Sequence, residues 1–210
     1  MASRGIIWRL LIISKIIRFL NGYKISRANG ISNVKIRDSA TTYIRICKNS
    51  IQGEGVLLLN PNAVNRKESS KLRIDDGGVL IINGTVSLYT GFNIHIGKGG
   101  VLRIEDGTFI NENSLISIAD KCEIGKQCAI SNNVTIIDSN FHEINGELRS
   151  KEIKIGNKVL IGLNTTVLKG SLINDNCVIG AESVVVGEIE KNSIATGRIA
   201  KRINECVGWK

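Results

Sequence analysis

Proline and aromatic residues are scarce in this chain. Its 210 residues include one Pro, and aromatic side chains make up only 4%. A core with so few rings must be built from aliphatic side chains, and the sequence supplies 35 Ile together with 22 Gly and 21 Asn. Ile favours pleated, half-buried surfaces, whereas Gly and Asn favour tight turns. Because 42% of the residues are hydrophobic, the composition excludes wholesale disorder, and it disfavours a helical bundle.

Histidine is also rare, and the cysteines lack a paired spacing. The two histidines, His95 and His142, are too few for a zinc site built from three histidines, as in carbonic anhydrases, so we expect no metal. The five cysteines never occur as C-x-x-C, which excludes zinc ribbons and thioredoxin-like chemistry. Thiols of this kind indicate a reducing compartment with buried, inert cysteines, and we therefore expect a cytoplasmic protein.

Acidic residues are absent from the first 37 positions, which carry eight Lys and Arg. Residues 198–210 carry four basic side chains against Glu205. The body between them, residues 38–197, has 16 basic and 18 acidic residues, a net charge of −2, whereas the whole chain has a net charge of +9. A nucleic-acid-binding protein more often spreads positive charge over its folded face, so we expect no nucleic-acid partner.

An apolar stretch over residues 6–20 is interrupted by Arg9, Lys15 and Arg18. It is shorter than the ~20 residues that a membrane-spanning helix needs, and it lacks the small-residue cleavage site of a signal peptide. The pattern predicts a cationic amphipathic helix within a basic N-terminal segment, residues 1–30. Such a helix would lie either on a membrane surface or against its own protein or a neighbouring subunit, and the sequence leaves both open.

A six-residue repeat dominates the rest of the chain. From residue 118 onward, aliphatic side chains recur at every sixth position, and a small or short side chain follows each by four residues. The aliphatic positions are Ile118, Ile124, Ile130, Ile136, Ile155, Ile161, Val167, Ile173, Ile179 and Val185, and a weaker version runs through Ile74, Leu80, Val86 and Phe92. Six is not a helical period, but it fits short strands that turn around a common axis with Gly and Asn in the turns.

Three such strands would close one triangular coil, and stacked coils would bury the Ile columns between parallel sheets. We therefore predict an all-β fold, a triangular parallel β-solenoid over residues 31–197. Residues 1–30 precede it and a basic tail, residues 198–210, follows it. Proline would break the ladders and large rings would not fit the narrow prism, which explains why both are scarce.

The period breaks once. Ile136 and Ile155 are 19 residues apart, so a polar loop over residues 138–152 is inserted into the prism. Insertions in a solenoid usually map to surface loops, often on the binding face. His142 lies in this loop. His95 lies in a weak strand, where we expect a solvent-facing structural residue.

The repeat and the loop resemble the hexapeptide-repeat acyltransferases. Within that superfamily they resemble the bacterial O-acetyltransferases that modify galactosides, maltose, capsule and O-antigen. The likeness covers residues 111–201. Its motifs are DSNFHEI from Asp138 to Ile144, IGNKVLIG from Ile155 to Gly162, VIGAESVV from Val178 to Val185 and GRIAK from Gly197 to Lys201. Three positions depart from the family pattern: Asn140 replaces an Asp, Leu160 replaces a Trp that lies beside the acyl donor in relatives, and Ile199 replaces a Pro.

The resemblance implies a left-handed parallel β-helix, a homotrimer with active sites in grooves between neighbouring prisms, and acetyl-CoA as co-substrate. His142 would be the general base that takes a proton from a sugar hydroxyl, because imidazole titrates close to neutral pH. Asp138 would orient the imidazole or bind the sugar, although a turn-forming Asp is an equally good interpretation. Asn111, Asp120 and Asn140 would contact the acceptor, and Asn111 and Asp120 are equally compatible with corner positions.

For the donor, the resemblance places the backbone N–H that stabilises the tetrahedral intermediate at Gly162 or Leu163. Gly180 and Ala181 would leave room for the pantetheine arm. Lys201 and Arg202 would face the phosphates of coenzyme A. A solvated basic tail is the alternative interpretation of these two cations.

Three functions remain open on this scaffold. We favour acetyl transfer to a sugar of a surface polysaccharide or its lipid-linked precursor. A basic N-terminal segment would concentrate such an enzyme at the inner face of the membrane, where these glycans are assembled. A free small acceptor, such as a galactoside, maltose, serine or an antibiotic, would use the same histidine. A non-catalytic scaffold would be expected to lack the inserted loop.

Overall fold

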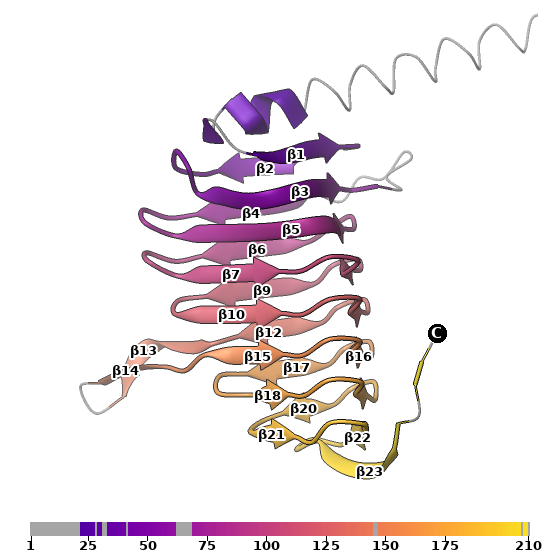
Figure 1. Ribbon diagram of the computed structural model, residues 1–210. Helices are drawn as coiled ribbons and strands as arrows, with labels where there is room; N and C mark the ends of the chain where they lie inside the picture. The colour runs from indigo at the N-terminus through magenta and orange to yellow at the C-terminus, as the bar shows by residue number, and fades with distance from the viewer. Residues whose placement is uncertain are drawn as a thin grey trace, which may run out of the picture.

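The computed structural model describes residues 22–27, 29–30, 33–40, 42–61, 69–144, 147–206 and 208–209. Its strands stack in parallel and form the three faces of a prism, with the N-terminal coil at one end and β23 at the other (Figure 1). The amphipathic helix expected over residues 6–20 lies outside the described residues. Within them, no helix has the length and apolar character that crossing a bilayer requires.

The first two faces belong to one sheet, because β3 (Ile51–Leu59) and β5 (Val79–Leu88) run along both of them. From β5 the first face continues through β7 (Val101–Ile104), β10 (Lys121–Ile124), β15 (Ile153–Ile155), β18 (Leu172–Ile173) and β21 (Glu188–Ile189). The second face contains β1 (Asn33–Asp38), β8 (Phe109–Ile110), β11 (Ala129–Ile130), β16 (Leu160–Ile161), β19 (Val178–Ile179) and β22 (Ser193–Thr196). β23 (Lys201–Glu205) ends this sheet, in antiparallel pairing with β22.

The third face is a separate seven-stranded sheet. Its strands are β2 (Thr42–Arg45), β4 (Ser70–Ile74), β6 (Asn93–Ile96), β9 (Leu115–Ile118), β12 (Thr135–Ile137), β17 (Thr166–Leu168) and β20 (Val184–Val185). The register stacks like on like, since Ile94 pairs with Ile116 and Ile116 with Ile136. The fold is the parallel β-solenoid that the repeat predicts, and it is the left-handed β-helix that the family resemblance implies.

Aliphatic side chains fill the interior of the prism. All ten repeat positions from Ile118 to Val185 are buried, and so are the four weaker ones from Ile74 to Phe92. Cys122, Cys128 and Cys177 occupy inward corners as short residues of the repeat, and burial raises the pKa of each thiol. His95 is partly exposed on β6, with its Nε2 at 2.9 Å from Asp75 Oδ2, which confirms the predicted solvent-facing strand position.

Asparagine is frequent because the corners of the coils need left-handed backbone. Asn113, Asn133, Asn164, Asn176 and Asn192 have φ between 56° and 58°, a region that Asn tolerates better than most residues. Their side chains also stack from coil to coil. Asn133 Nδ2 donates to Asn164 Oδ1 at 3.1 Å, and Asn176 Nδ2 donates to Asn192 Oδ1 at 2.9 Å. The coil itself therefore accounts for much of the excess of Asn.

A short helix over residues 22–27 closes the N-terminal end of the prism (Figure 1). Its Ile25 is buried against the end of the core. Asn29 then bonds to β3 as a strand would: its Nδ2 donates to Ile51 O and its Oδ1 accepts from Ile51 N, both at 2.8 Å. These contacts satisfy polar groups that the open end of a solenoid would otherwise leave unpaired.

Candidate functional site

The inserted loop protrudes from the prism at the corner between the third and first faces (Figure 1). After β12 the chain forms β13 (Ser139–Ile144) and β14 (Glu147–Ser150), which pair with each other in antiparallel fashion. It then rejoins the stack at β15, whose Ile155 pairs with Ile124 on the preceding coil. The loop is therefore an outgrowth of one corner that leaves the parallel ladders on both sides intact.

Asp138 holds the base of this loop. Its side chain is buried, Oδ1 accepts from Ala119 N and Oδ2 from Asp120 N, both at 2.8 Å. Its carbonyl accepts from Lys151 N at 2.9 Å, so the residue ties the two ends of the loop to the preceding coil. Burial raises the pKa of the carboxyl, and the N–H groups of Ala119 and Asp120 oppose that rise.

The contacts of Asp138 match those of corner residues elsewhere in the prism. Asn157 Oδ1 accepts from Lys126 N at 2.9 Å, and Asp175 Oδ1 accepts from Asn157 N at 2.6 Å. Among the described residues, no hydrogen bond joins Asp138 to His142. These contacts support the turn-forming interpretation of Asp138, while its action on the imidazole stays a prediction.

His142 lies on an irregular strand. β13 and β14 pair Ser139 with Ser150 and Glu143 with Leu148, so the register shifts across His142 and forms a β-bulge. Phe141 in this bulge has φ 56°, which is uncommon for a bulky residue, and its N–H donates to Ser139 Oγ at 3.1 Å. The side chains of Phe141 and His142 are both exposed. Bulges re-aim side chains and are frequent beside active sites.

Asn140 and Asp120 lie at the same corner as His142. Asn140 is half-buried in the bulge, and Asp120 is exposed in the turn between β9 and β10. Within the described part of the chain, the His142 imidazole makes no hydrogen bond or ion pair. One corner therefore brings together His142, Asp138, Asn140 and Asp120.

Five other predicted residues lie at a different corner, between the second and third faces. Gly162 and Leu163 follow β16, Gly180 and Ala181 follow β19 one coil further on, and Asn111 follows β8 two coils earlier. A Cβ atom on Gly162 would lie 2.5 Å from Ala181 N, and one on Gly180 would lie 2.7 Å from Thr196 Oγ1. The close approach of the next coil therefore requires glycine at both positions, whether or not a ligand also uses the space.

Backbone hydrogen bonds distinguish the two candidate donors to a tetrahedral intermediate. Gly162 N donates to Ile179 O at 2.8 Å as part of the ladder. Leu163 N has no acceptor among the residues that the structure describes, and the residue is 48% exposed. An N–H that is already engaged cannot serve an oxyanion without breaking the ladder. Leu163 is therefore the better candidate.

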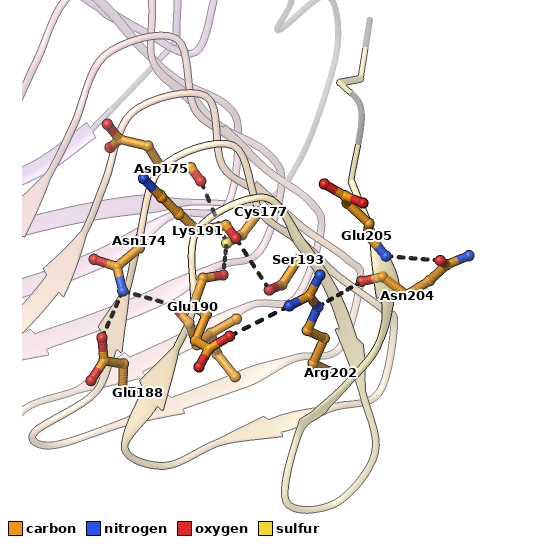
Figure 2. Close-up of polar contacts among 11 residues, drawn as sticks. Asn174, Asp175, Cys177, Glu188, Glu190, Lys191, Ser193, Arg202, Asn204 and Glu205 are labelled. Atoms are coloured by element: carbon orange, nitrogen blue, oxygen red, sulfur yellow. Dashed lines mark hydrogen bonds and ion pairs between the residues drawn. The ribbon is translucent and has the colours of Figure 1, made fainter.

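Lys201 and Arg202 are exposed on β23, at the C-terminal end of the prism. Figure 2 shows Arg202 beside Glu190, with Nη1 at 3.4 Å from Oε2, and its Nε donating to Asn204 O at 3.4 Å. The Glu190 side chain is 74% exposed, so solvent screens this pair and it contributes little stability. Lys201 forms no ion pair within the described ranges. Both cations are available to an anionic ligand, and a solvated basic tail remains an equal interpretation.

Apart from Lys201 and Arg202, the predicted residues are thus divided between two corners of one prism. The third face, with β12, β17 and β20, separates the corner of His142 from the corner of Leu163. In acyl transfer, a base acts on the attacking hydroxyl and an oxyanion donor on the carbonyl under attack, so the two groups must lie together when the reaction occurs. A single chain does not bring these two groups together.

Two features of the site were not predicted. Left-handed backbone is signalled by Gly, Asn or Asp, and Phe141 is none of these. The second feature is Trp209 in the C-terminal tail, whose Nε1 donates to Lys158 O at 2.7 Å, two residues before Leu160. One feature of the sequence could have pointed to this contact: the chain lacks the family's Trp at position 160 and has a Trp in its tail.

Known proteins resemble this chain in both sequence and fold. It is 33% identical over 156 residues to galactoside O-acetyltransferase of Escherichia coli (strain K12), a match that covers 70% of this chain and 73% of that protein. It is 31% identical over 120 residues to the lipopolysaccharide biosynthesis O-acetyl transferase WbbJ of the same strain, a match that covers 50% of this chain and 61% of WbbJ. The solved structure of AntD, an N-acyltransferase from Bacillus cereus in complex with dTDP and coenzyme A, has the same fold, with a TM-score of 0.60, 14% identity and 88% of each chain covered. No family model matches the chain.

Proposed function

Because the chain belongs to the hexapeptide-repeat acetyltransferase family, we propose that it transfers an acetyl group from acetyl-CoA to a sugar hydroxyl, with His142 as the general base. The exposed imidazole of His142 carries this proposal, since it lies on a bulge that protrudes from an otherwise uniform prism. The imidazole takes the hydroxyl proton as the oxygen attacks the thioester carbonyl carbon, and it returns that proton to the departing thiolate. The Leu163 N–H of a neighbouring chain donates to the oxyanion in between.

The acceptor that we propose is a surface polysaccharide or its lipid-linked precursor. The likeness to WbbJ supports this acceptor, as does the strongly basic N-terminal end described below. The likeness to a galactoside O-acetyltransferase favours the second candidate, a free sugar. Both candidates use the same histidine, so an acceptor panel separates them.

The test is a transfer assay that measures CoA release from acetyl-CoA. The panel contains galactosides, maltose, longer oligosaccharides, a lipid-linked glycan and serine, and we expect release only with sugars. His142→Ala should lower kcat by about 10²–10⁴-fold and leave the Kd for acetyl-CoA unchanged. His95→Ala on β6 is the matched control and should retain activity. An absence of CoA release with every acceptor, together with no binding of acetyl-CoA, would overturn the enzymatic function.

We also propose that the active protein is a homotrimer, in which the His142 corner of one chain meets the Leu163 corner of the next. The surface of the C-terminal coils supports this arrangement. Many outward side chains of the first face are charged, as with Lys121, Glu123 and Lys154, although Val101 and Leu172 are apolar. Outward side chains of the other two faces are uncharged, and many are apolar: Phe109, Ala129, Leu160, Val178 and Ile194 on the second face, and Leu115, Ile137, Leu168 and Val184 on the third. In a ring of three prisms with the third face of each chain toward the axis, the His142 corner of one chain would meet the Leu163 corner of the next. This arrangement would bury the uncharged third face and leave the charged first face pointing outward.

Two measurements test the homotrimer. Light scattering should give the mass of three chains, and mixed assemblies should show complementation between corners. His142→Ala and Ala181→Trp change different corners, so each variant should be inactive alone. Co-expression should restore part of the activity, because some interfaces in a mixed trimer contain both intact corners. A fully active monomer would refute the shared site.

For its location, we propose a cytoplasmic protein whose N-terminal end contacts the anionic inner face of the membrane. Residues 1–53 contain ten Lys and Arg and a single acid, Asp38, so they account for the whole net charge of +9. Asp38 is buried. Six exposed cations surround this end of the prism and are called the basic collar here: Lys24, Arg27, Lys35, Arg37, Arg45 and Lys48. Tyr23 and Tyr43 are 56% and 62% exposed beside them, and tyrosine is common at membrane interfaces.

Cosedimentation with vesicles tests this location. Each Lys or Arg near an anionic surface contributes about 1 kcal/mol. Replacing Lys35, Arg37, Arg45 and Lys48 by Gln should therefore weaken binding to phosphatidylserine vesicles by about 10³-fold at low salt. Phosphatidylcholine vesicles are the control, and transfer to a free sugar should be unaffected. Equal binding to both kinds of vesicle would refute the contact.

A further inference from the structure

The C-terminal tail turns back along the prism. After β23 the chain runs along the corner between the first and second faces, back toward the earlier coils (Figure 1). Cys206 N donates to Asn192 O at 2.8 Å, and Asn176 Nδ2 donates to Cys206 O at 3.2 Å. Trp209 Nε1 then donates to Lys158 O at 2.7 Å. Asn192, Asn176 and Lys158 belong to three successive coils, so the tail anchors its indole well away from the end of the prism.

A cavity of about 480 Å³ lies beside this indole. Its lining residues are Gln127, Lys158, Asn176, Gly208 and Trp209. The Gln127 side-chain amide and the Lys158 ammonium have no partner among the described residues, and neither does Asn176 Oδ1. The cavity therefore combines a flat apolar ring, groups that donate and accept hydrogen bonds, and one cation, all held on stacked coils.

We infer that this cavity, at the corner between the first and second faces, is a subsite for an acidic sugar residue of the acceptor glycan, some sugars away from the one that is acetylated. The flat indole of Trp209 offers apolar surface to the apolar side of a sugar ring. The Gln127 amide can donate and accept, and Asn176 Oδ1 can accept, which matches hydroxyl groups; the Asn176 Nδ2 group already donates to Asn192 and Cys206. The ammonium of Lys158 is a point charge that suits a carboxylate. This assignment rests on the proposed function, and it requires an acceptor longer than one sugar.

The competing occupant is the nucleotide end of coenzyme A. That end carries several phosphate charges, whereas the cavity lining offers one ammonium and two neutral amides. Phosphate sites commonly recruit Arg for bidentate contact, and the lining contains none. An enzyme can also use the binding energy of a sugar that does not react to orient the hydroxyl that does. The lining therefore fits a sugar better than a nucleotide.

Fluorescence provides a direct binding test. Trp8 and Trp209 are the two tryptophans of the chain, so the Trp8→Phe variant reports on Trp209 alone. We would titrate it with a hyaluronan tetrasaccharide, which alternates uronic acid and N-acetylhexosamine, with maltotetraose and with coenzyme A. The expected result is a saturable change with the acidic tetrasaccharide, at least tenfold weaker binding of maltotetraose, and no change with coenzyme A. A response to coenzyme A alone, or to no probe, would overturn the subsite.

Kinetics provide a second test in the unmodified background. Trp209→Ala should raise KM for an oligosaccharide acceptor tenfold or more, and leave KM for acetyl-CoA and for a monosaccharide unchanged. Trp209→Phe should recover most of the loss. Lys158→Gln should raise KM only for acidic acceptors, with exposed Lys98→Gln at another corner as the charge control.

The two levels of the proposal fail differently. An enzyme that acetylates no acceptor overturns the proposed function. Intact transfer with the acceptor KM unaffected by Trp209→Ala overturns only the subsite. A variant that loses stability and raises both KM values alike would show that the tail is merely structural, which also overturns the subsite.

Discussion

Replacement of Asp138 by alanine separates a structural role of this carboxylate from a chemical one. In the folded protein it accepts from Ala119 N and Asp120 N, each at 2.8 Å, in a buried position. Alanine leaves both N–H groups without their acceptor. Both donors are only partly buried, so water can replace part of the lost interaction, and each lost hydrogen bond costs about 0.5–1.5 kcal/mol. The two together predict a loss of about 1–3 kcal/mol in the free energy of unfolding.

The pH dependence of this loss follows from the pKa of Asp138. Burial raises that pKa in the folded state above its unfolded value of about 3.9. The stability that the group contributes is therefore complete below the unfolded value, and it decreases as the pH rises through the folded pKa. Asp138→Ala should consequently destabilise the protein more at pH 4 than at pH 7.

Urea unfolding measures the loss, and kcat per folded molecule measures the effect on catalysis. Asp138→Asn keeps one acceptor oxygen and should lose less stability than Asp138→Ala. Asp120→Ala is the control, because it removes an exposed carboxylate at the same corner on the preceding coil. It should leave the midpoint of urea unfolding unchanged. If Asp138→Ala unfolds like the wild type but loses more than a hundredfold in kcat, the carboxylate acts in the chemistry and the reasoning from its contacts is wrong.

Two further predictions concern thiols and glycines. One thiol of the native protein should react rapidly with Ellman's reagent, because Cys47 is exposed and the other four cysteines are buried. Burial also raises the pKa of Cys128 to about 11. A second rapidly reacting thiol would contradict this packing. Gly55→Ala should lower the thermal midpoint well beyond Gly187→Ala. Both glycines have a positive φ, which costs about 1–2 kcal/mol when Ala adopts it. Only at Gly55 would the added Cβ atom overlap the backbone of Gly84. Equal thermal midpoints for the two variants would refute that contact.

The fold could be predicted because the repeat records which side chains point inward. A residue such as Ile136 pairs in register with Ile116 and Val167, so one column of the core appears in the sequence as a period. The interruption of the period predicted the loop for the same reason. The corner between faces needs left-handed backbone, and Asn at positions such as Asn133 and Asn164 records that as well.

The details of the site depend on pairings that no period records. The bulge at His142 follows from how Ser139 and Glu143 pair across the loop, which the order of residues along β13 does not state. Whether Gly162 or Leu163 has a free N–H depends on which of them the ladder engages. The return of Trp209 to Lys158 is a contact between residues 51 positions apart in a non-repetitive tail.

The separation of the two corners links catalysis to location, if the proposed trimer is correct. In a closed cyclic ring the three prisms run in the same direction, so the basic collars of all three chains face one side. Their attraction to an anionic surface would then add, by about 1 kcal/mol for each cation that reaches it. Charged substitutions at Leu168 and Val184, on the uncharged third face, should therefore lower transfer activity and vesicle binding together. The matched change at Glu123 on the charged face should lower neither. Loss of transfer with undiminished vesicle binding would mean that the collar of a single chain suffices, and that assembly serves the active site alone.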